Sequence, residues 1–277
     1  MSATTTNSLW YVYGIVPGDT SMTSIPGGID DAGVSIERAA DIAALVSVLD
    51  GAVYSPSAIE RASGDVEWLS PRAVAHDRVL TWASDHGAVI PLPMFSLFSG
   101  ESAVQRMLSD RGPQLSRTLS RVANGREYAL RVYRIDAELA PAVVGLSPRL
   151  SELARTAGAA SIGQRYLLER KLETEKKAEM RVVTKQIVEE IVDALSRSAL
   201  SVHRSAIPKT PAADGSRGTM VLNAAYLIAP AALEAFQRTL TALVERHGAH
   251  GFRFDFTGPW PPYHFVEHAG DETDGAQ

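Results

Sequence analysis

Residues 256–266 have the sequence Phe-Thr-Gly-Pro-Trp-Pro-Pro-Tyr-His-Phe-Val, in which three prolines and one glycine constrain the backbone around four aromatic rings. Each proline fixes φ near about −65° and lacks an N–H group, which excludes the middle of a helix and a central strand of a sheet. Gly258 and Trp260 each precede a proline and are pushed toward extended conformations. We therefore expect a rigid corner at an edge of the fold or on its surface.

This corner allows two interpretations. The aromatic rings can pin the last strand onto the second domain, or they can form a preorganised surface for a partner, because rigid aromatic anchors lose little entropy on binding. The residues in question, as partner contacts or as a structural signature, are Gly258, Pro259, Trp260, Pro261, Pro262, Tyr263 and Phe265.

The composition indicates a folded protein with two domains of ordinary size. The chain has 277 residues, of which 45% are hydrophobic and 21% charged, and its net charge of −5 gives no general attraction to nucleic acid. The absence of cysteine excludes disulfides, thiolate metal sites and cysteine nucleophiles, and is compatible with a reducing cytosol. The polar start, Met1–Ser8, has no pattern of a secretion signal, and we expect no membrane span.

The first part of the chain predicts an α+β domain with ferredoxin-like character over residues 1–136. Apolar and β-branched runs bounded by turn residues indicate strands, and apolar residues at helical spacing indicate helices. Ser70 and Pro71 suit the start of a helix, and Pro91 and Pro93 restrict the run that contains them to a sheet edge. We expect the helices to pack on one face of the sheet. The expected strands are 9–16, 34–38, 42–49, the edge segment 89–98 and 128–135; the expected helices are 71–86 and one kinked helix or two short helices within 101–122.

The second part predicts another α+β domain, residues 161–277, after a linker or short helix at 137–160. Residues 164–197 contain no proline or glycine and carry an apolar seam, which predicts a helix about 45 Å long. Its charged stretch, 169–179, suits either a solvated helix face or a coiled-coil-like partner surface. The order after this helix is β-β-α-β followed by the corner, with strands at 200–207, 219–228 and 250–256 and a helix at 230–247.

Motifs of catalysis and cofactor binding are absent from the sequence. Neither a glycine-rich phosphate loop nor a nucleophile elbow occurs. Two histidine pairs, His247 with His250 and His264 with His268, have spacings found in metal sites, but neither pair lies within one expected helix. We therefore expect no catalytic residue, no metal and no cofactor.

The corner closely resembles the carboxy-terminal signature of the gas vesicle accessory proteins GvpF and GvpL, through Gly258–Tyr263 followed by Phe265 and Val266. Other segments resemble the same family in the same order along the chain. Met94, Ser96 and Leu97 depart from the Arg, Gly and Thr of many members, and His264 replaces a frequent Ser. The further matching segments are Tyr11–Val16, Leu45–Val48, Val89–Leu92 with Phe95, and Gly163 with Tyr166, Leu167 and Lys171.

The resemblance implies a non-enzymatic protein of gas vesicle assembly, cytoplasmic or associated with the vesicle. Its implied partners are the hydrophobic shell protein GvpA and other accessory Gvp proteins, with no role for nucleic acid. We expect the long helix and the corner at Trp260 to contribute to these contacts. The alternative is a regulatory module that binds a small ligand through its ferredoxin-like domains.

Overall fold

The computed structural model describes residues 8–208 and 218–266, and the chain forms two compact units. The first unit contains the residues up to Glu127 together with those from Pro259 onward, and the second contains Tyr128–Gly258. The amino-terminal tail Met1–Asn7, His268 and most of the loop expected after residue 207 lie outside the described residues.

The first unit is built on an antiparallel sheet with the order β2-β3-β1-β4, in which β5 also pairs with β1. The three long strands confirm the expected ones, and a tight turn at Ala40 joins β2 to β3. Pro91 and Pro93 interrupt the edge segment, so only two short pieces of it pair with β1, as expected for an edge. The strands are β1 Ser8–Pro17, β2 Ser35–Ala39, β3 Ile42–Asp50, β4 Ile90–Pro91 and β5 Leu97–Phe98.

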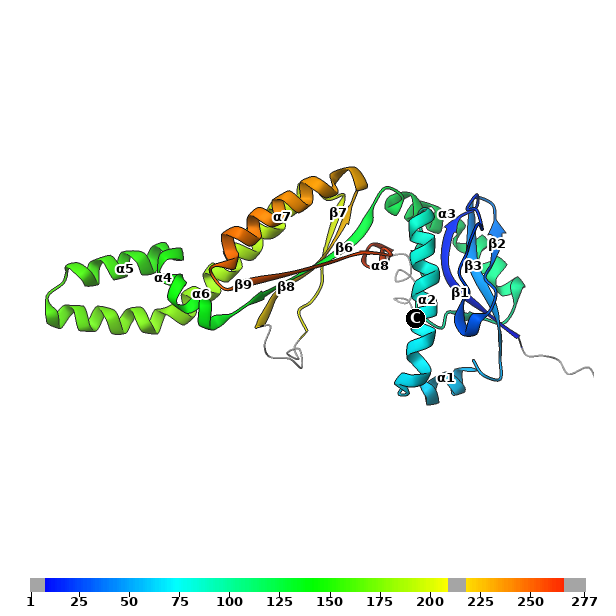
Figure 1. Cartoon of the computed structure of the whole chain (residues 1–277), viewed down its shortest axis with the longest axis horizontal. Helices are drawn as coiled ribbons and strands as arrows, with labels where there is room; N and C mark the ends of the chain where they lie inside the picture. Colours follow the sequence, from blue (N-terminus) through cyan, green and yellow to red (C-terminus); the bar gives the residue numbers. More distant parts are fainter. Residues whose placement is uncertain (1–7, 209–217, 267–277) are drawn as a thin grey trace, which may run out of the picture. The chain divides into compact units, whose positions relative to one another are not determined.

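Helices cover both faces of this sheet, so the expectation of helices on one face is wrong. Alternate residues of β3 point to opposite sides. Ala43 and Leu45 pack in one apolar cluster with α2 (Val66–His86), whereas Ala44 and Val46 pack in another with α3 (Glu101–Val122). The strands therefore lie between two helices, as is typical of β-strands that are apolar on both sides. Two short elements, η1 (Ile29–Asp31) and α1 (Pro56–Ala62), complete the unit (Figure 1).

Helix α2 begins five residues before the expected start, because Asp65 caps it and Ser70 does not. The Asp65 carboxylate accepts hydrogen bonds from the backbone N–H groups of Glu67 and Trp68, at 2.9 and 3.2 Å. Pro71 therefore lies inside the helix instead of in its first turn. Helix α3 likewise continues through Pro113 as one element, which decides between the two alternatives for this segment.

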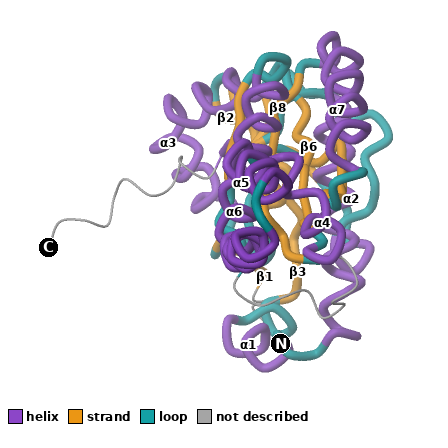
Figure 2. The backbone as a smooth tube through the Cα atoms, turned by 90° about the vertical axis from the view of Figure 1, so that its left-hand side faces the viewer, coloured by secondary structure: helices purple, strands orange, loops and turns teal. Residues whose placement is uncertain are grey.

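In its described residues, the second unit contains a sheet with the order β7-β8-β6-β9, four α-helices and one short 3₁₀ helix (Figure 2). Its single apolar core joins the sheet to α6 and α7, and even-numbered residues of β8 such as Ala224 and Tyr226 point into it. The elements are β6 Arg126–Arg134, α4 Asp136–Leu146, α5 Pro148–Ala159, α6 Ile162–Ser196, β7 Ser201–Arg204, β8 Thr219–Ile228, η3 Pro230–Ala232, α7 Leu233–Gly248 and β9 Phe252–Trp260.

The segment expected as a linker or short helix forms two helices, α4 and α5, that pack against α6. Ser147 separates them and caps α5, accepting a hydrogen bond from the Leu150 N–H at 3.1 Å. The same hydroxyl donates to the buried carboxylate of Glu179 in α6 at 2.7 Å. The Ser147 backbone N–H thus closes α4 by donating to the Val143 carbonyl, and its side chain caps α5 and attaches this junction to the long helix.

The compact units divide the chain differently from the sequence-based domains at two places. The strand expected to close the first domain, β6, is a central strand of the second sheet, and the residues after Gly258 return to the first unit. The chain passes from the first unit to the second within β6 and back again within β9, and these two strands are neighbours in one sheet. Residue patterns predict that a segment is a strand, but they do not say which sheet it joins.

Candidate functional site

The first three residues of the corner, Gly258, Pro259 and Trp260, end the edge strand β9 and are exposed. Gly258 has a φ of 128°, a region that favours glycine because other residues are hindered there by Cβ. Pro259 has no backbone N–H to donate, and an edge strand tolerates this because no further strand pairs with its outer side. The Trp260 side chain remains 42% exposed in this rigid setting. This part of the corner is therefore a shaped surface.

The remaining residues of the corner are anchored in the first unit. Pro261 and Pro262 are buried, and the short helix α8 (Tyr263–Val266) follows them. Tyr263 packs against the α2 side of the sheet. Phe265 and Val266 pack on the α3 side. The seven predicted residues thus form an exposed part and a buried part, and they do not line one common pocket.

Hydrogen bonds between Glu127 and His264 hold α8 in place. The Glu127 side chain is only 3% exposed, and its carboxylate accepts from the backbone N–H of His264 at 3.0 Å and lies 2.6 Å from the imidazole Nδ1. Burial raises the pKa of the neighbouring Tyr263 to about 12, and the negative charges of Asp77 and Glu127 act in the same direction. Glu127 was not identified from the sequence, because nothing local marks it as the partner of a residue 137 positions away.

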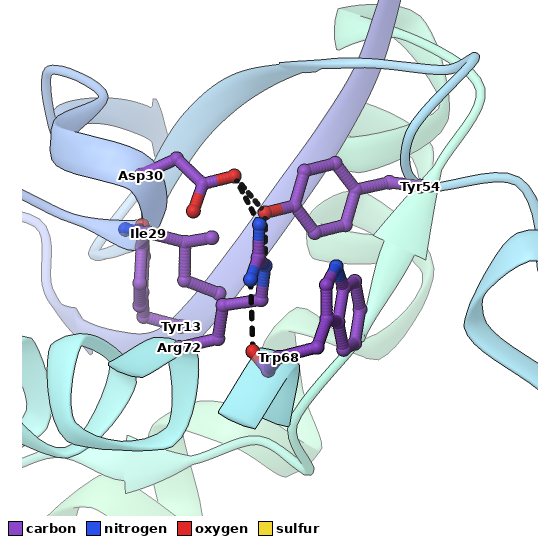
Figure 3. Close-up of polar contacts among 6 residues, drawn as sticks. All are labelled: Tyr13, Ile29, Asp30, Tyr54, Trp68 and Arg72. Carbon is purple, nitrogen blue, oxygen red and sulfur yellow. Dashed lines mark hydrogen bonds and ion pairs between the residues drawn. The ribbon is translucent and has the colours of Figure 1, made fainter. Parts of the chain in front are cut away.

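A second polar cluster joins Arg72 of α2 to loops distant in the sequence (Figure 3). The Arg72 guanidinium donates to the Tyr54 hydroxyl at 2.8 Å, to the Trp68 carbonyl at 2.8 Å and to the Asp30 carboxylate at 2.9 Å. It also lies 4.2 Å from the centre of the Trp68 ring, a cation–π geometry. Tyr54 donates to the same Asp30 oxygen. Hydrogen bonding to Tyr54 and the nearby negative charge of Asp30 raise the pKa of Arg72, although burial opposes them.

An aromatic layer continues from this cluster toward β1. Phe95 stacks on Trp68 with ring centres 5.6 Å apart, and its φ of 64° is in the left-handed region. Its backbone N–H donates to the Tyr11 hydroxyl at 3.2 Å. Because a non-glycine residue is strained at such a φ, this hydrogen bond and the stacking stabilise the turn. Trp68 and Phe95 pack against the apolar cluster that contains the buried Tyr11.

Tyr11, which contacts Phe95, also contacts a buried histidine, His76 of α2. The Tyr11 hydroxyl lies 2.6 Å from His76 Nδ1, and burial lowers the pKa of His76 to about 4 against a hydrogen bond with the Leu92 backbone. A neutral imidazole with its proton on Nε2 accepts a hydrogen bond from the Tyr11 hydroxyl at Nδ1. The partners of His76 are therefore the Tyr11 hydroxyl and the Leu92 backbone, which belong to the same unit.

The histidine pair lies at the end of α7, with His247 in its last turn and His250 just after it. Within residues 8–208 and 218–266, no group of three His, Asp or Glu side chains is arranged to hold a metal ion. His247 is buried, with its Nε2 atom 3.3 Å from Glu190, and burial lowers its pKa. Over the same residues, no helix has the length and apolar character needed to cross a bilayer.

The fold and the corner together define a class: a two-unit α+β protein with an exposed, proline-stiffened aromatic edge. Residues 9–267 match the model of the family described as "Gas vesicle synthesis protein GvpL/GvpF". The chain belongs to this family.

Individual relatives agree with this assignment. The chain is 26% identical over 275 residues to gas vesicle protein L of Streptomyces sp. (strain CB03234), covering 98% of each. It is also 26% identical to gas vesicle protein L1 of Halobacterium salinarum, covering 94% of this chain and 91% of that one. The crystal structure of GvpF from Microcystis aeruginosa has a TM-score of 0.65 at 21% identity over 94% of this chain and 99% of its own, which shows a common fold.

Proposed function

We propose that this protein is a non-enzymatic accessory protein of gas vesicle assembly, which acts in the cytoplasm and at the vesicle. The observation that carries the proposal is the family match over residues 9–267. Its partners in this proposal are the hydrophobic shell protein GvpA and other accessory Gvp proteins.

A physical reason supports such a partner. A shell subunit with one apolar face would aggregate before assembly, and a soluble protein that covers this face would prevent aggregation. Trp260 suits a first contact, because its ring is 42% exposed on a backbone that loses little entropy when a partner binds. Tyr263 and Phe265, which pack against the clusters of the first unit, hold that backbone and are not partner contacts in this proposal.

Deletion of the gene tests the role in assembly. We expect few or no gas vesicles by electron microscopy and recovery with the wild-type gene. Normal, abundant vesicles in the deletion strain would count against the proposal. A thermal shift with a metabolite, without any association with shell protein, would instead favour the regulatory-module alternative.

Substitution of Trp260 tests the contact surface separately from folding. Trp260→Ser should reduce co-purification of GvpA about tenfold while the unfolding midpoint stays close to that of the wild type. Val53→Ser is a matched control, because Val53 is 41% exposed in the same unit. Equal GvpA recovery with both variants would show that the exposed end of the corner does not contact the shell protein.

A further inference from the structure

The long helix α6 has two halves with different surroundings. All of its buried residues lie between Glu179 and Leu195, where it covers the second sheet. The preceding residues, 162–178, form about 25 Å of helix without one buried residue. This first half extends past the apolar core of its unit, and helix α5 runs beside it (Figure 1).

Exposed apolar side chains gather where α5 turns into α6. We call residues 155–171 the hairpin tip. Ile162 is 89% exposed, Tyr166 61% and Leu167 67%, whereas Leu168 is half-buried. Exposed apolar side chains of soluble proteins are usually scattered singly over the surface. A group of them on one short segment therefore indicates an interaction surface.

A groove of about 580 Å³ lies between the two helices at the hairpin tip. Leu167, Leu168, Ala159 and Ala160 supply apolar lining, and Arg155 lies among its polar residues. A third helix can place its apolar side chains into the groove between two antiparallel helices. The shape therefore suits an amphipathic helix.

The charge of the hairpin tip differs from that of the whole chain. Its cations are Arg155, Arg165, Arg170 and Lys171, against one acidic residue, Glu169, although the chain carries a net charge of −5. Arg155 pairs with Glu152 and Arg165 donates to carbonyls at the end of α5. Lys171 lies 4.0 Å from the Glu175 carboxylate, whereas Arg170 makes no ion pair with any residue in the described part of the chain. Arg155 lines the groove and the other three cations lie on the same short segment, an excess of positive charge that favours an acidic occupant.

We propose that the hairpin tip is the docking surface for an acidic amphipathic helix of a partner protein. Leu167 and Tyr166 supply apolar anchors, and Arg170 and Lys171 face its carboxylates. A second copy of the chain fits less well, because two cationic tips repel each other. The inference rests on the proposed function, in which the partners are other gas vesicle proteins.

The test measures binding of the full-length protein to each co-encoded gas vesicle protein, including GvpA, after co-expression and purification. Tyr166→Ser/Leu167→Ser should weaken the interaction with at least one of them about tenfold. Arg170→Glu/Lys171→Glu should weaken the same interaction about fivefold, and wild-type binding should fall as salt rises from about 50 to about 500 mM.

Matched controls lie on exposed positions elsewhere in the same unit. Val182→Ser/Val244→Ser removes two exposed apolar side chains away from the tip, and Arg181→Glu/Lys185→Glu reverses two exposed charges on the second half of α6. Both controls should retain wild-type binding. All four variants change exposed side chains and should keep the wild-type unfolding midpoint.

The outcomes separate this inference from the proposed function. Gas vesicle proteins that bind the wild type and the tip variants equally would overturn the docking surface and leave the proposed function standing. If none binds the wild type, both fail. Binding that does not change with the salt concentration or with the charge reversal would exclude an acidic helix as the occupant. A tip-dependent dimer of the protein alone would show that the occupant is a second copy and overturn the proposal.

Discussion

At the scale of single residues, Arg72 shows how one side chain can join segments that are far apart in the sequence. It contacts Asp30 in η1, Tyr54 before α1 and the Trp68 carbonyl within its own helix. Asp30 is 44% exposed, so solvent weakens the charge attraction, and most of the stabilisation comes from the hydrogen bonds and from the ring packing.

Removal of this guanidinium should destabilise the first unit. We expect Arg72→Met to lower the free energy of unfolding by about 2 kcal/mol, because the Tyr54 hydroxyl oxygen and the Asp30 carboxylate lose this donor. Arg72→Lys should retain less than half of this stabilisation, since an ammonium group cannot supply the planar, forked hydrogen-bond donors of a guanidinium. Urea unfolding measures both, with Arg61→Met on an exposed face of α1 as the control. A loss no larger than that of the control would contradict this account.

His76 should make the stability depend on pH. Its pKa is about 4 in the folded protein, whereas an unfolded histidine titrates near about 6.5. Between these values the unfolded state binds a proton that the folded state excludes, so the free energy of unfolding falls as the pH falls. Over this window the loss is on the order of 3 kcal/mol.

Urea unfolding of the wild type and His76→Asn from about pH 7 to about pH 4 tests this dependence. The asparagine cannot titrate, so the variant should show a shallower decline. His247 also has a lowered pKa and contributes in the same sense to both proteins, so the difference between the two curves isolates His76. Parallel curves would assign the pH dependence to other groups.

At the scale of elements, capping side chains decide where several helices begin. Asp65 starts α2 ahead of Pro71, and the aromatic packing of Trp68 keeps the extra turn. A proline inside a helix removes one backbone hydrogen bond, which costs about 3 kcal/mol. Buried residues later in α2, such as Val79 and Leu80, offset this cost through packing that a local pattern does not reveal.

Two serines before neighbouring helices should differ in their importance. Ser147 caps α5 and donates to the buried Glu179, so Ser147→Ala should cost about 2 kcal/mol. Ser161 precedes α6 without a side-chain bond to the helix backbone, and Ser161→Ala should cost less than about 0.5 kcal/mol. Thermal and urea unfolding of both variants compare them directly. Equal losses of stability in the two variants would contradict the expected difference between the two serines.

At the scale of the whole molecule, the chain leaves the first unit after Glu127 and returns after Gly258. The second unit is therefore one continuous segment, and the first is made of two. Tyr263, Phe265 and Val266 complete apolar clusters whose other members come before residue 123. The stability of the first unit thus depends on the end of the described chain.

Fragments test this dependence. Residues 128–258 should unfold cooperatively alone, whereas residues 1–127 should lose about 4 kcal/mol because they lack the three apolar side chains of α8 and the partner of Glu127. A synthetic peptide of residues 259–266 should raise the midpoint of the 1–127 fragment. Identical midpoints with and without the peptide would show that α8 is dispensable for the first unit.

Local patterns were sufficient for most elements. The nearly continuous apolar run of β3 and the uninterrupted seam of α6 predict these elements to within two residues, because they depend on neighbours in the sequence. The corner identified the family because proline stiffness and aromatic rings are visible in the sequence itself. The cluster of Arg72 and the pair of Glu127 with His264 were missed, since their partners lie 18 to 137 positions apart.

The sequence by itself thus determined the α+β class, the long helix, the edge position of the prolines and the family. Only the tertiary structure decided that β6 joins the second sheet, that helices cover both faces of the first, and that the corner divides into an exposed Trp260 and a helix α8 that packs against the first unit. The physical reason is range. Backbone constraints and periodicity act over a few residues, whereas the choice of sheet and of buried partner depends on packing between distant segments.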